Sequence, residues 1–263
     1  MKKTITGFHA IEEILKAEKK TPKTKDKNSY PIEIVYSKQG PRVKKILELA
    51  QNLNIPIRQE DNKNLDKHTK HLPAMLQDHR GIILFMETKN NSFNITADEF
   101  FARLSEKEKS VVVILDSITD PHNIGSIVRS ADQFGIDGII IPENGSGGLE
   151  NSGFEVILKI SSGASAWVPV IPVNNIVRVA ERLKKEGFWI YGADTGGSSI
   201  YDFKFAEKTV IVMGSEGNGM SRLMEKTCDA VISIPTQGKL DSLNVSIAAG
   251  ILFYEVRRNF FIN

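Results

Sequence analysis

Gly214-Ser-Glu-Gly-Asn-Gly-Met-Ser221 and Ser242-Leu-Asn-Val-Ser246 are the two stretches that decide the fold of this chain. The first follows an apolar run, Val210–Met213, and the second opens an amphipathic segment that reaches Arg258. Another apolar run, Ala230–Pro235, lies between them. Polar loops that follow buried strands are typical of the carboxyl edge of an open α/β sheet, where ligands bind. We therefore expect the ligand site near the C-terminus.

Length and composition exclude several classes of protein. The chain has 263 residues, of which 41% are hydrophobic, enough for one large domain or two ordinary ones. The single cysteine, Cys228, excludes a disulfide framework and a cysteine-rich zinc site, and we expect no metal. No apolar run approaches the roughly twenty residues of a membrane helix, and the N-terminus does not resemble a signal peptide. A soluble, cytoplasmic protein is expected.

Charge is distributed unevenly along the chain. Residues 1–92 carry 18 Lys and Arg against 11 Asp and Glu, whereas residues 93–263 carry 16 against 21. A basic first part on a mildly acidic remainder suggests a module that binds a polyanion such as nucleic acid. The alternative is a set of solvated surface lysines, and charge alone does not decide between the two.

Apolar spacing predicts two α/β domains. In residues 1–88 we expect helices at 8–15, 41–54 and, less clearly, 65–76, with strands at 31–36, 55–57 and 81–86. The asparagine-rich segment 89–97 is the predicted linker, and Thr96 has the features of a helix N-cap.

Residues 98–263 show a regular alternation of strands and helices. Strands are expected at 111–115, 138–142, 188–191, 210–213 and 230–235, with helices at 97–108, 124–134, 176–186 and from 245 onward. A glycine-rich loop is expected at 144–153. Strands that alternate with helices indicate a mainly parallel sheet covered on both faces.

A first candidate site motif runs from Asp116 to Asp132 and follows a predicted strand. Its helix would bury the stripe Ile124, Ile127, Val128 and Ala131, with Asn123 as a plausible N-cap. Arg129 lies beside that stripe. By pattern alone, Arg129 is more often a surface or salt-bridge residue than a functional one.

The loop Gly214–Ser221 is a second candidate motif. It lacks the Gly-Lys-Ser/Thr ending of a phosphate-binding loop and the glycine spacing of a dinucleotide fingerprint. Glu216 stands inside it where a phosphate cradle would have a lysine. A carboxylate at this place favours a neutral or cationic ligand, although a plain turn into a helix at Ser221 fits the pattern too.

The third motif runs from Pro235 to Ser246, and either Ser242 or Asn244 would cap the last helix. The small residues Ala248, Ala249 and Gly250 indicate close packing of that helix, against this chain or a second copy. The five histidines and Cys228 show no catalytic or metal-binding pattern, and we interpret them as structural or solvated.

Together the three motifs resemble those of the SpoU (TrmH-type) RNA 2′-O-methyltransferases. The first motif, Asp-Pro-x-Asn-x-Gly…Arg, is met by Asp120, Pro121, Asn123, Gly125 and Arg129. The second is met by Gly214, Glu216, Gly217 and Gly219, and the third by Ile234, Pro235, Gly238 and Ser242–Ser246. Thr236 departs from the methionine that is usual after Ile-Pro. The first domain resembles the family's substrate-binding domain of ribosomal-protein L30e type, as in the 23S rRNA guanosine-2′-O-methyltransferase branch.

The resemblance implies a fold that no periodicity could reveal. Residues 98–263 would form a SPOUT methyltransferase domain whose C-terminal segment is threaded into a deep trefoil knot, a feature nearly absent among proteins. Residues 1–88 would bind the RNA substrate, and the family implies a homodimer whose active sites draw on both chains. The cofactor would be S-adenosylmethionine, with Gly214, Ile234, Leu243, Thr195 and Gly219 as its contacts.

The same resemblance assigns catalysis to Arg129, Asn123, Glu216, Ser242 and Asn244. The family gives proton removal from the ribose 2′-hydroxyl to the arginine. Guanidinium normally stays charged, so Arg129 would act more readily as a cation that stabilises the forming alkoxide. The expected substrate is a guanosine in 23S rRNA. The alternatives are a tRNA ribose methyltransferase, an adenosine-specific resistance enzyme, or a catalytically idle RNA-binding or ribosome-assembly factor.

Overall fold

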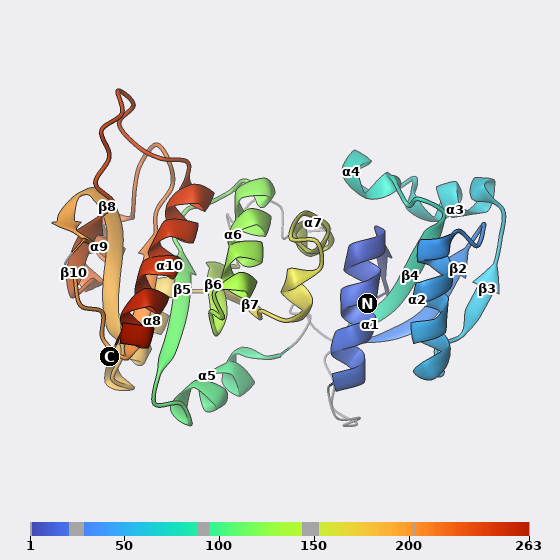
Figure 1. Cartoon of the computed structure of the whole chain (residues 1–263), viewed down its shortest axis with the longest axis horizontal. Coiled ribbons are helices and arrows are strands. Elements are labelled where there is room, and N and C mark those ends of the chain that lie inside the picture. The colour runs from blue at the N-terminus through green and yellow to red at the C-terminus, as the bar shows by residue number, and fades with distance from the viewer. Residues whose placement is uncertain (1, 21–28, 89–94, 144–152, 202, 263) are drawn as a thin grey trace.

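The computed structural model describes residues 2–20, 29–88, 95–143, 153–201 and 203–262. Two α/β lobes lie side by side, each built on its own sheet (Figure 1). Within the described ranges no helix is both long and apolar enough to cross a membrane. Most of the predicted linker and the glycine-rich loop 144–152 lie outside these ranges.

The N-terminal lobe has a four-stranded sheet in the order β1-β4-β2-β3. β4 pairs with β1 and β2 in antiparallel fashion, and β2 pairs with β3 in parallel fashion. Helices α1 and α2 pack on one face of this sheet, and α3 packs on the other. The bounds are β1 Lys2–Thr6, α1 Phe8–Lys20, β2 Ser29–Tyr36, α2 Pro41–Asn52, β3 Ile57–Gln59, α3 Asn62–Thr69, α4 Ala74–Gln77 and β4 Ile82–Thr88.

The C-terminal lobe has a six-stranded sheet in the order β10-β8-β9-β5-β6-β7, and every pair in it is parallel. The alternation seen in the sequence therefore predicted the sheet type correctly. The bounds are α5 Ala97–Ser105, β5 Ser110–Leu115, α6 Pro121–Gln133, β6 Gly138–Pro142, α7 Gly153–Ile160, the 3₁₀ turn η1 Ala164–Ala166, β7 Val170–Val173, α8 Ile176–Lys185, β8 Trp189–Ser199, β9 Lys208–Met213, α9 Arg222–Thr227, β10 Ala230–Ser233 and α10 Val245–Ile262.

Helices cover both faces of the larger sheet. Odd-numbered residues of β5, such as Val111, face α6 and α10, while even-numbered ones, such as Val112, face α5, α8 and α9. All six residues of β5 are 0% exposed. Full burial of a Val, Leu or Ile side chain contributes about 1.5–3 kcal/mol, which makes this strand the centre of the lobe. α10 packs on α6 of the same chain, where Gly250 lies beside Ser130.

One helix cap was predicted wrongly, and four elements were not predicted. Asn123 is not the N-cap of α6, because that helix begins at Pro121 and Asp120 Oδ1 accepts the His122 N–H at 2.9 Å. Proline suits the first helical position, since its missing N–H would have had no partner there. The elements α7, η1, β7 and the edge strand β1 were not predicted at all.

α7 was not predicted, and it is buried on more than one side. Phe154 and Leu158 belong to the core of the N-terminal lobe, whereas Ile157 belongs to the core of the C-terminal lobe. Figure 1 shows α7 between the two lobes. Its two charged residues, Glu155 and Lys159, are buried and half-buried between the lobes, so this eight-residue helix has no solvent-exposed polar face of the kind that identifies an amphipathic surface helix.

Candidate functional site

A bulge in β8 brings the middle of that strand into the site. β10 pairs with β8 at Gly192 and then again at Ser198, so residues 193–197 of β8 are not paired with β10. Gly197 permits this path, because a Cβ there would lie 2.6 Å from backbone atoms of Ile232. The bulge places Ala193, Asp194 and Thr195 on the wall of a pocket.

The glycine loop after β9 closes on itself as a small hairpin. Ser215 and Gly219 exchange backbone hydrogen bonds of 3.0 and 2.9 Å, which puts Glu216 at its tip. Gly214 has no room for a side chain, since a Cβ would lie 2.2 Å from the backbone carbon of Gly219. This glycine therefore serves the closure of the loop on itself.

Asp116 fastens the far end of the same loop. Its side chain is buried at the carboxyl end of β5, and Oδ2 accepts the Ser221 N–H at 2.7 Å. Ser117 donates its hydroxyl to the other carboxylate oxygen at 3.0 Å. Ser221 in turn caps α9, and a helix start at Ser221 was the alternative interpretation of this loop. Asp116 opens the first sequence motif, but no role was predicted for it.

The three motifs meet in one hydrogen-bond network. Asn244 Nδ2 donates to Glu216 Oε1 at 2.7 Å and to Asn123 Oδ1 at 3.1 Å. The same carboxylate oxygen accepts the Val245 N–H at 3.3 Å. Asn244 also caps α10, since its Oδ1 accepts the Ser246 N–H at 3.0 Å. Side chains from three separate segments are thereby fixed around the start of α10.

A pocket of about 450 Å³ lies among the bulge of β8, the hairpin loop and the loop before α10. All five residues expected to hold a cofactor line it: Thr195, Gly214, Gly219, Ile234 and Leu243. Glu216 and Ser242 line it as well. The charged lining residues are all acidic, namely Asp194, Glu216 and Asp241. Sequence reasoning did not find Asp194, and a strand that is interrupted by a bulge gives no motif from which to find it.

Arg129 is the exception among the candidate residues. It lies on α6 about 9 Å along the helix from Asn123, as six residues at 1.5 Å each require. Its Nη1 reaches Ser162 Oγ at 3.5 Å, and it lines a second hollow, between the lobes, not the pocket described above. Within the described part of one chain, Arg129 and the hairpin loop are therefore not brought together.

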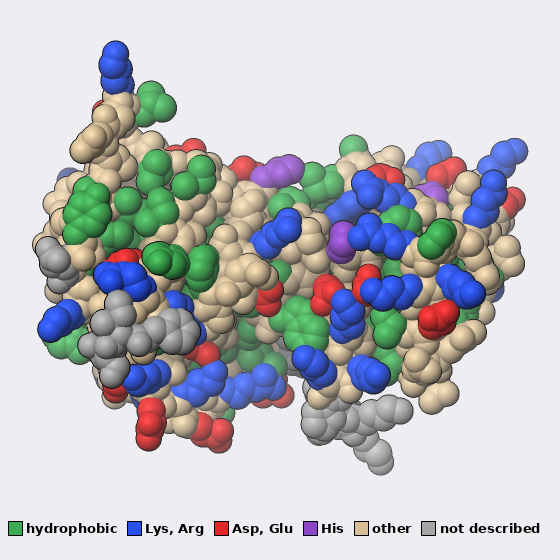
Figure 2. All heavy atoms as spheres, viewed as in Figure 1, with side chains coloured by type: hydrophobic (Ala, Val, Ile, Leu, Met, Phe, Trp, Pro, Cys, Tyr) green, Lys and Arg blue, Asp and Glu red, His purple; other side chains and the backbone are tan. Residues whose placement is uncertain are grey.

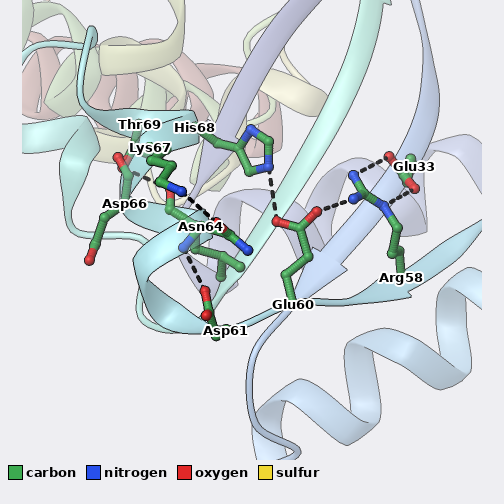
Figure 3. Close-up of polar contacts among 10 residues, drawn as sticks. Glu33, Arg58, Glu60, Asp61, Asn64, Asp66, Lys67, His68 and Thr69 are labelled. Atoms are coloured by element: carbon green, nitrogen blue, oxygen red, sulfur yellow. Dashed lines mark hydrogen bonds and ion pairs between the residues drawn. The ribbon is translucent and has the colours of Figure 1, made fainter.

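Cys228 and two histidines have structural partners. Burial raises the pKa of the Cys228 thiol to about 11, which disfavours the thiolate that a nucleophile needs. His68 contacts Glu60, which is also paired with Arg58, and Arg58 bonds Glu33 (Figure 3). His79 lies against Asp66 and accepts the Gly81 N–H. In the described ranges no three His, Cys, Asp or Glu side chains gather as a metal site would require.

Known proteins resemble this chain over most of its length. The model of the SpoU rRNA Methylase family matches residues 110–254. A 23S rRNA (guanosine-2′-O-)-methyltransferase of Neisseria meningitidis is 34% identical over 97% of this chain and 94% of its own length. An uncharacterized tRNA/rRNA methyltransferase of Borreliella burgdorferi is 39% identical over 85% of this chain and 96% of its own.

Solved structures share the fold. The SpoU methyltransferase AviRb of Streptomyces viridochromogenes, determined in complex with AdoMet, superposes with a TM-score of 0.76 at 21% identity, over 99% of this chain and 91% of that one. The matched motifs, the parallel sheet and the relatives that span both lobes point to one conclusion. This chain belongs to the SpoU rRNA methylase family.

Proposed function

We propose that this protein methylates the ribose 2′-hydroxyl of a guanosine in 23S rRNA, with S-adenosylmethionine as the methyl donor. The observation that carries the proposal is the pocket at the ends of β8, β9 and β10, whose charged lining is entirely acidic. The relatives named for 23S rRNA guanosine cover both lobes of this chain, which supports the substrate.

The pocket suits S-adenosylmethionine better than a phosphorylated nucleotide. Asp194, Glu216 and Asp241 offer negative charge to a ligand that carries a sulfonium and an ammonium group. Ile234, Leu243 and Leu252 give it an apolar wall of the kind that takes an adenine ring. When bound, S-adenosylmethionine supplies a methyl group that is already activated for transfer.

The remaining task of the protein is to orient the ribose and to stabilise charge. When the ribose 2′-oxygen takes the methyl group, its hydroxyl proton would pass to water, and Arg129 would stabilise the negative charge that forms on the oxygen as a fixed cation. Asn123, Ser242 and Asn244 would position the ribose and the donor, because their network joins the loops that surround the pocket. A 2′-hydroxyl as acceptor restricts the substrate to RNA.

We propose a homodimer in which the partner supplies Arg129 to the pocket. Ile247, Ile251 and Tyr254 form an apolar stripe on α10 and are 56%, 37% and 56% exposed. Their spacing places them on one face of the helix, and Figure 2 shows hydrophobic side chains gathered over this part of the molecule. A second copy on this face would cover the stripe.

Mixing two inactive variants tests the shared site. In a mixture of Arg129→Ala and Glu216→Gln chains, half of the dimers pair one of each, and one of their two sites has both residues intact. We therefore expect about a quarter of wild-type methylation to return. If each chain held a complete site of its own, the mixture would stay inactive. Light scattering on Ile251→Glu tests the dimer itself.

The proposal extends to the finer architecture. Residues 1–88 would be the L30e-like RNA-binding domain, 89–97 the linker and 98–263 the SPOUT domain with its trefoil knot. The overall likeness to SpoU methyltransferase structures supports this assignment. A cytoplasmic location goes with it, because the bacterial relatives are named for 23S rRNA.

The central experiment measures transfer of labelled methyl groups to unmodified 23S rRNA and to tRNA, followed by mapping of the product. We expect one 2′-O-methylguanosine in 23S rRNA and no transfer by Arg129→Ala. Product in tRNA or on an adenosine would support the corresponding alternative. Absence of S-adenosylmethionine binding in a calorimetric titration would favour the idle RNA-binding factor.

A further inference from the structure

A second hollow, of about 570 Å³, lies between the lobes on the side of α1 and α6. The N-terminal lobe lines it with His9, Glu13 and Lys20, and the C-terminal lobe with Arg129, Ser162 and Trp167. We call it the interlobe groove. Its volume is in the range of ordinary ligand sites. Because both lobes contribute to its walls, it exists only when they are docked together.

The cations of the groove are available to a ligand. Arg42, on α2, lies beside the groove, where its Nη2 donates to Nε2 of the lining residue His9 at 3.0 Å and its guanidinium lies 5.8 Å from the centre of the Phe8 ring. Lys20 lies 4.9 Å above the Trp167 ring, a contact that leaves its ammonium at the surface. Glu13, by contrast, is already paired with Lys16 and accepts the Trp167 Nε1–H at 2.8 Å. Asp132 is the remaining carboxylate in the lining.

The surface around the groove is also rich in positively charged side chains. Figure 2 shows Lys and Arg side chains spread over the N-terminal lobe on the face that bears α1 and α2. Arg42 and Lys44 are exposed on α2, and Lys19 and Lys20 are exposed at the end of α1. Cations beside a tryptophan face are the combination that binds single-stranded RNA, through its phosphates and its bases.

We propose that the interlobe groove binds the RNA that adjoins the methylated nucleotide, with Arg42 and Lys20 at phosphates and Trp167 against a base. This inference rests on the proposed function, which supplies the reason for RNA at Arg129. The groove would connect the basic surface of the N-terminal lobe to the arginine that acts on the ribose. The lobes would then be needed together for binding, because neither one forms both walls.

Tryptophan fluorescence gives a direct test. The chain has two tryptophans, and Trp189 is 54% exposed on β8, away from the groove. In Trp189→Phe, emission comes from Trp167 alone. Titration with in vitro transcribed, unmodified 23S rRNA should change that emission and saturate with binding measured by filter retention. Retention of RNA with unchanged Trp167 emission would overturn the inference.

Salt dependence gives a second, independent test. Loss of one phosphate contact lowers the slope of log K against log salt concentration by about 0.7 to 0.9. We expect that change for Arg42→Gln. Lys63→Gln is the matched control, because it removes an exposed lysine from α3 at the other end of the lobe and should leave the slope unchanged. Equal slopes for wild type and Arg42→Gln would contradict the proposal.

The two hypotheses fail in different ways. If the protein neither retains RNA nor transfers methyl groups, the proposed function is wrong. If it methylates 23S rRNA while Trp167 emission and the Arg42 salt slope stay unchanged, the function stands and the groove does not bind the RNA.

Discussion

Asp116 is a buried carboxylate whose main partner is a backbone N–H of the glycine loop. Asp116→Ala would leave the Ser221 N–H without an acceptor at the end of β5. Hydrogen bonds to charged groups contribute about 1.5–3 kcal/mol, so we expect a loss of stability of that order. We also expect weaker S-adenosylmethionine binding by calorimetry, since the loop forms one wall of the pocket.

A conservative variant separates positioning from general destabilisation. Asp116→Asn keeps an oxygen that can accept the same N–H, so cofactor binding should recover most of the loss. Glu207→Ala removes an exposed carboxylate that pairs with Lys109 at the surface and should change neither quantity by much. Equal cofactor affinity for Asp116→Ala and wild type would show that the loop closes without this side chain.

Cys228 should be unreactive in the folded protein. With the pKa raised to about 11 by burial, the thiolate fraction at pH 8 falls about 100-fold relative to an ordinary thiol with a pKa of about 9. Alkylation of the native protein by iodoacetamide should be slower by at least that factor than in urea. The Cys228 thiol keeps its proton to a higher pH in the folded state than in the unfolded state. The contribution of this protonated thiol to the free energy of unfolding is therefore lost as the pH rises from about 9 to 11. Rapid native alkylation at pH 8 would contradict this.

At the scale of elements, the bulge of β8 depends on Gly197. A Cβ at this position would lie 2.6 Å from the backbone of Ile232, and backbone cannot move aside as a side chain can. Overpacking of this kind costs about 1–3 kcal/mol, which we expect for Gly197→Ala in urea unfolding. Cofactor affinity should fall as well, because the bulge carries Asp194 and Thr195 into the pocket.

Gly196→Ala is the control for this element. Its Cβ would meet only Asp194 Oδ1 at 3.6 Å, an ordinary contact. Both variants add one methyl group to a glycine, at neighbouring positions of the same strand. A similar loss of stability in the two would mean that the bulge tolerates a side chain at Gly197, against the geometry.

Two kinds of element were predictable from the sequence: helices with one apolar and one polar face, and short strands made of apolar residues. β5 was recognised because its six residues are apolar or small, and α6 was recognised from Ile124, Ile127, Val128 and Ala131, which are all fully buried. The capping box of Thr96 and Glu99 at α5 was readable for the same local reason. The start of α6 was misjudged, because Asp120 and Asn123 are both good caps and only the backbone path selects between them.

Several residues of the site could be predicted from the sequence, but their hydrogen bonds to one another could not. Glu216, Asn244 and Asn123 could be named from their motifs, while their shared hydrogen bonds depend on how the three loops fold over one another. Gly214 was named as a cofactor contact, and the structure adds a separate requirement for glycine at this position, the closure of the loop. Asp116 and Asp194 were missed because neither has a local pattern: Asp116 accepts the N–H of the distant Ser221, and Asp194 reaches the pocket through the bulge of β8.

At the scale of the whole molecule, the lobes are held together by more than a linker. Lys3 and Glu155 form an ion pair of 3.1 Å across the junction, and the Glu155 side chain is 3% exposed. Trp167 donates to Glu13 from the opposite lobe. α7 contributes to both cores, as described above. A segment that completes two cores couples their folding, so the lobes should unfold in a single transition.

Lys159 of α7 is the test of this coupling. Its ammonium donates to the backbone oxygens of Met75 at 2.6 Å and Asp78 at 2.8 Å in the N-terminal lobe. Burial lowers the pKa of Lys159, so these bonds form where water is partly excluded. Lys159→Met keeps the length of the side chain and removes its donors, which should cost about 1–3 kcal/mol. By calorimetry, we expect the single transition of the wild type to split into two.

The control for Lys159 is Lys109, a lysine whose ion pair lies at the surface. Lys109→Met breaks an ion pair with Glu207 whose side chains are 46% and 65% exposed, and such pairs contribute about 0–1 kcal/mol. It should keep a single transition. If Lys159→Met also unfolds in one step with unchanged stability, the apolar contacts of α7 alone join the lobes. The interlobe groove would then depend on Phe154 and Leu158 for its shape, since these two residues fix α7 in the core of the N-terminal lobe.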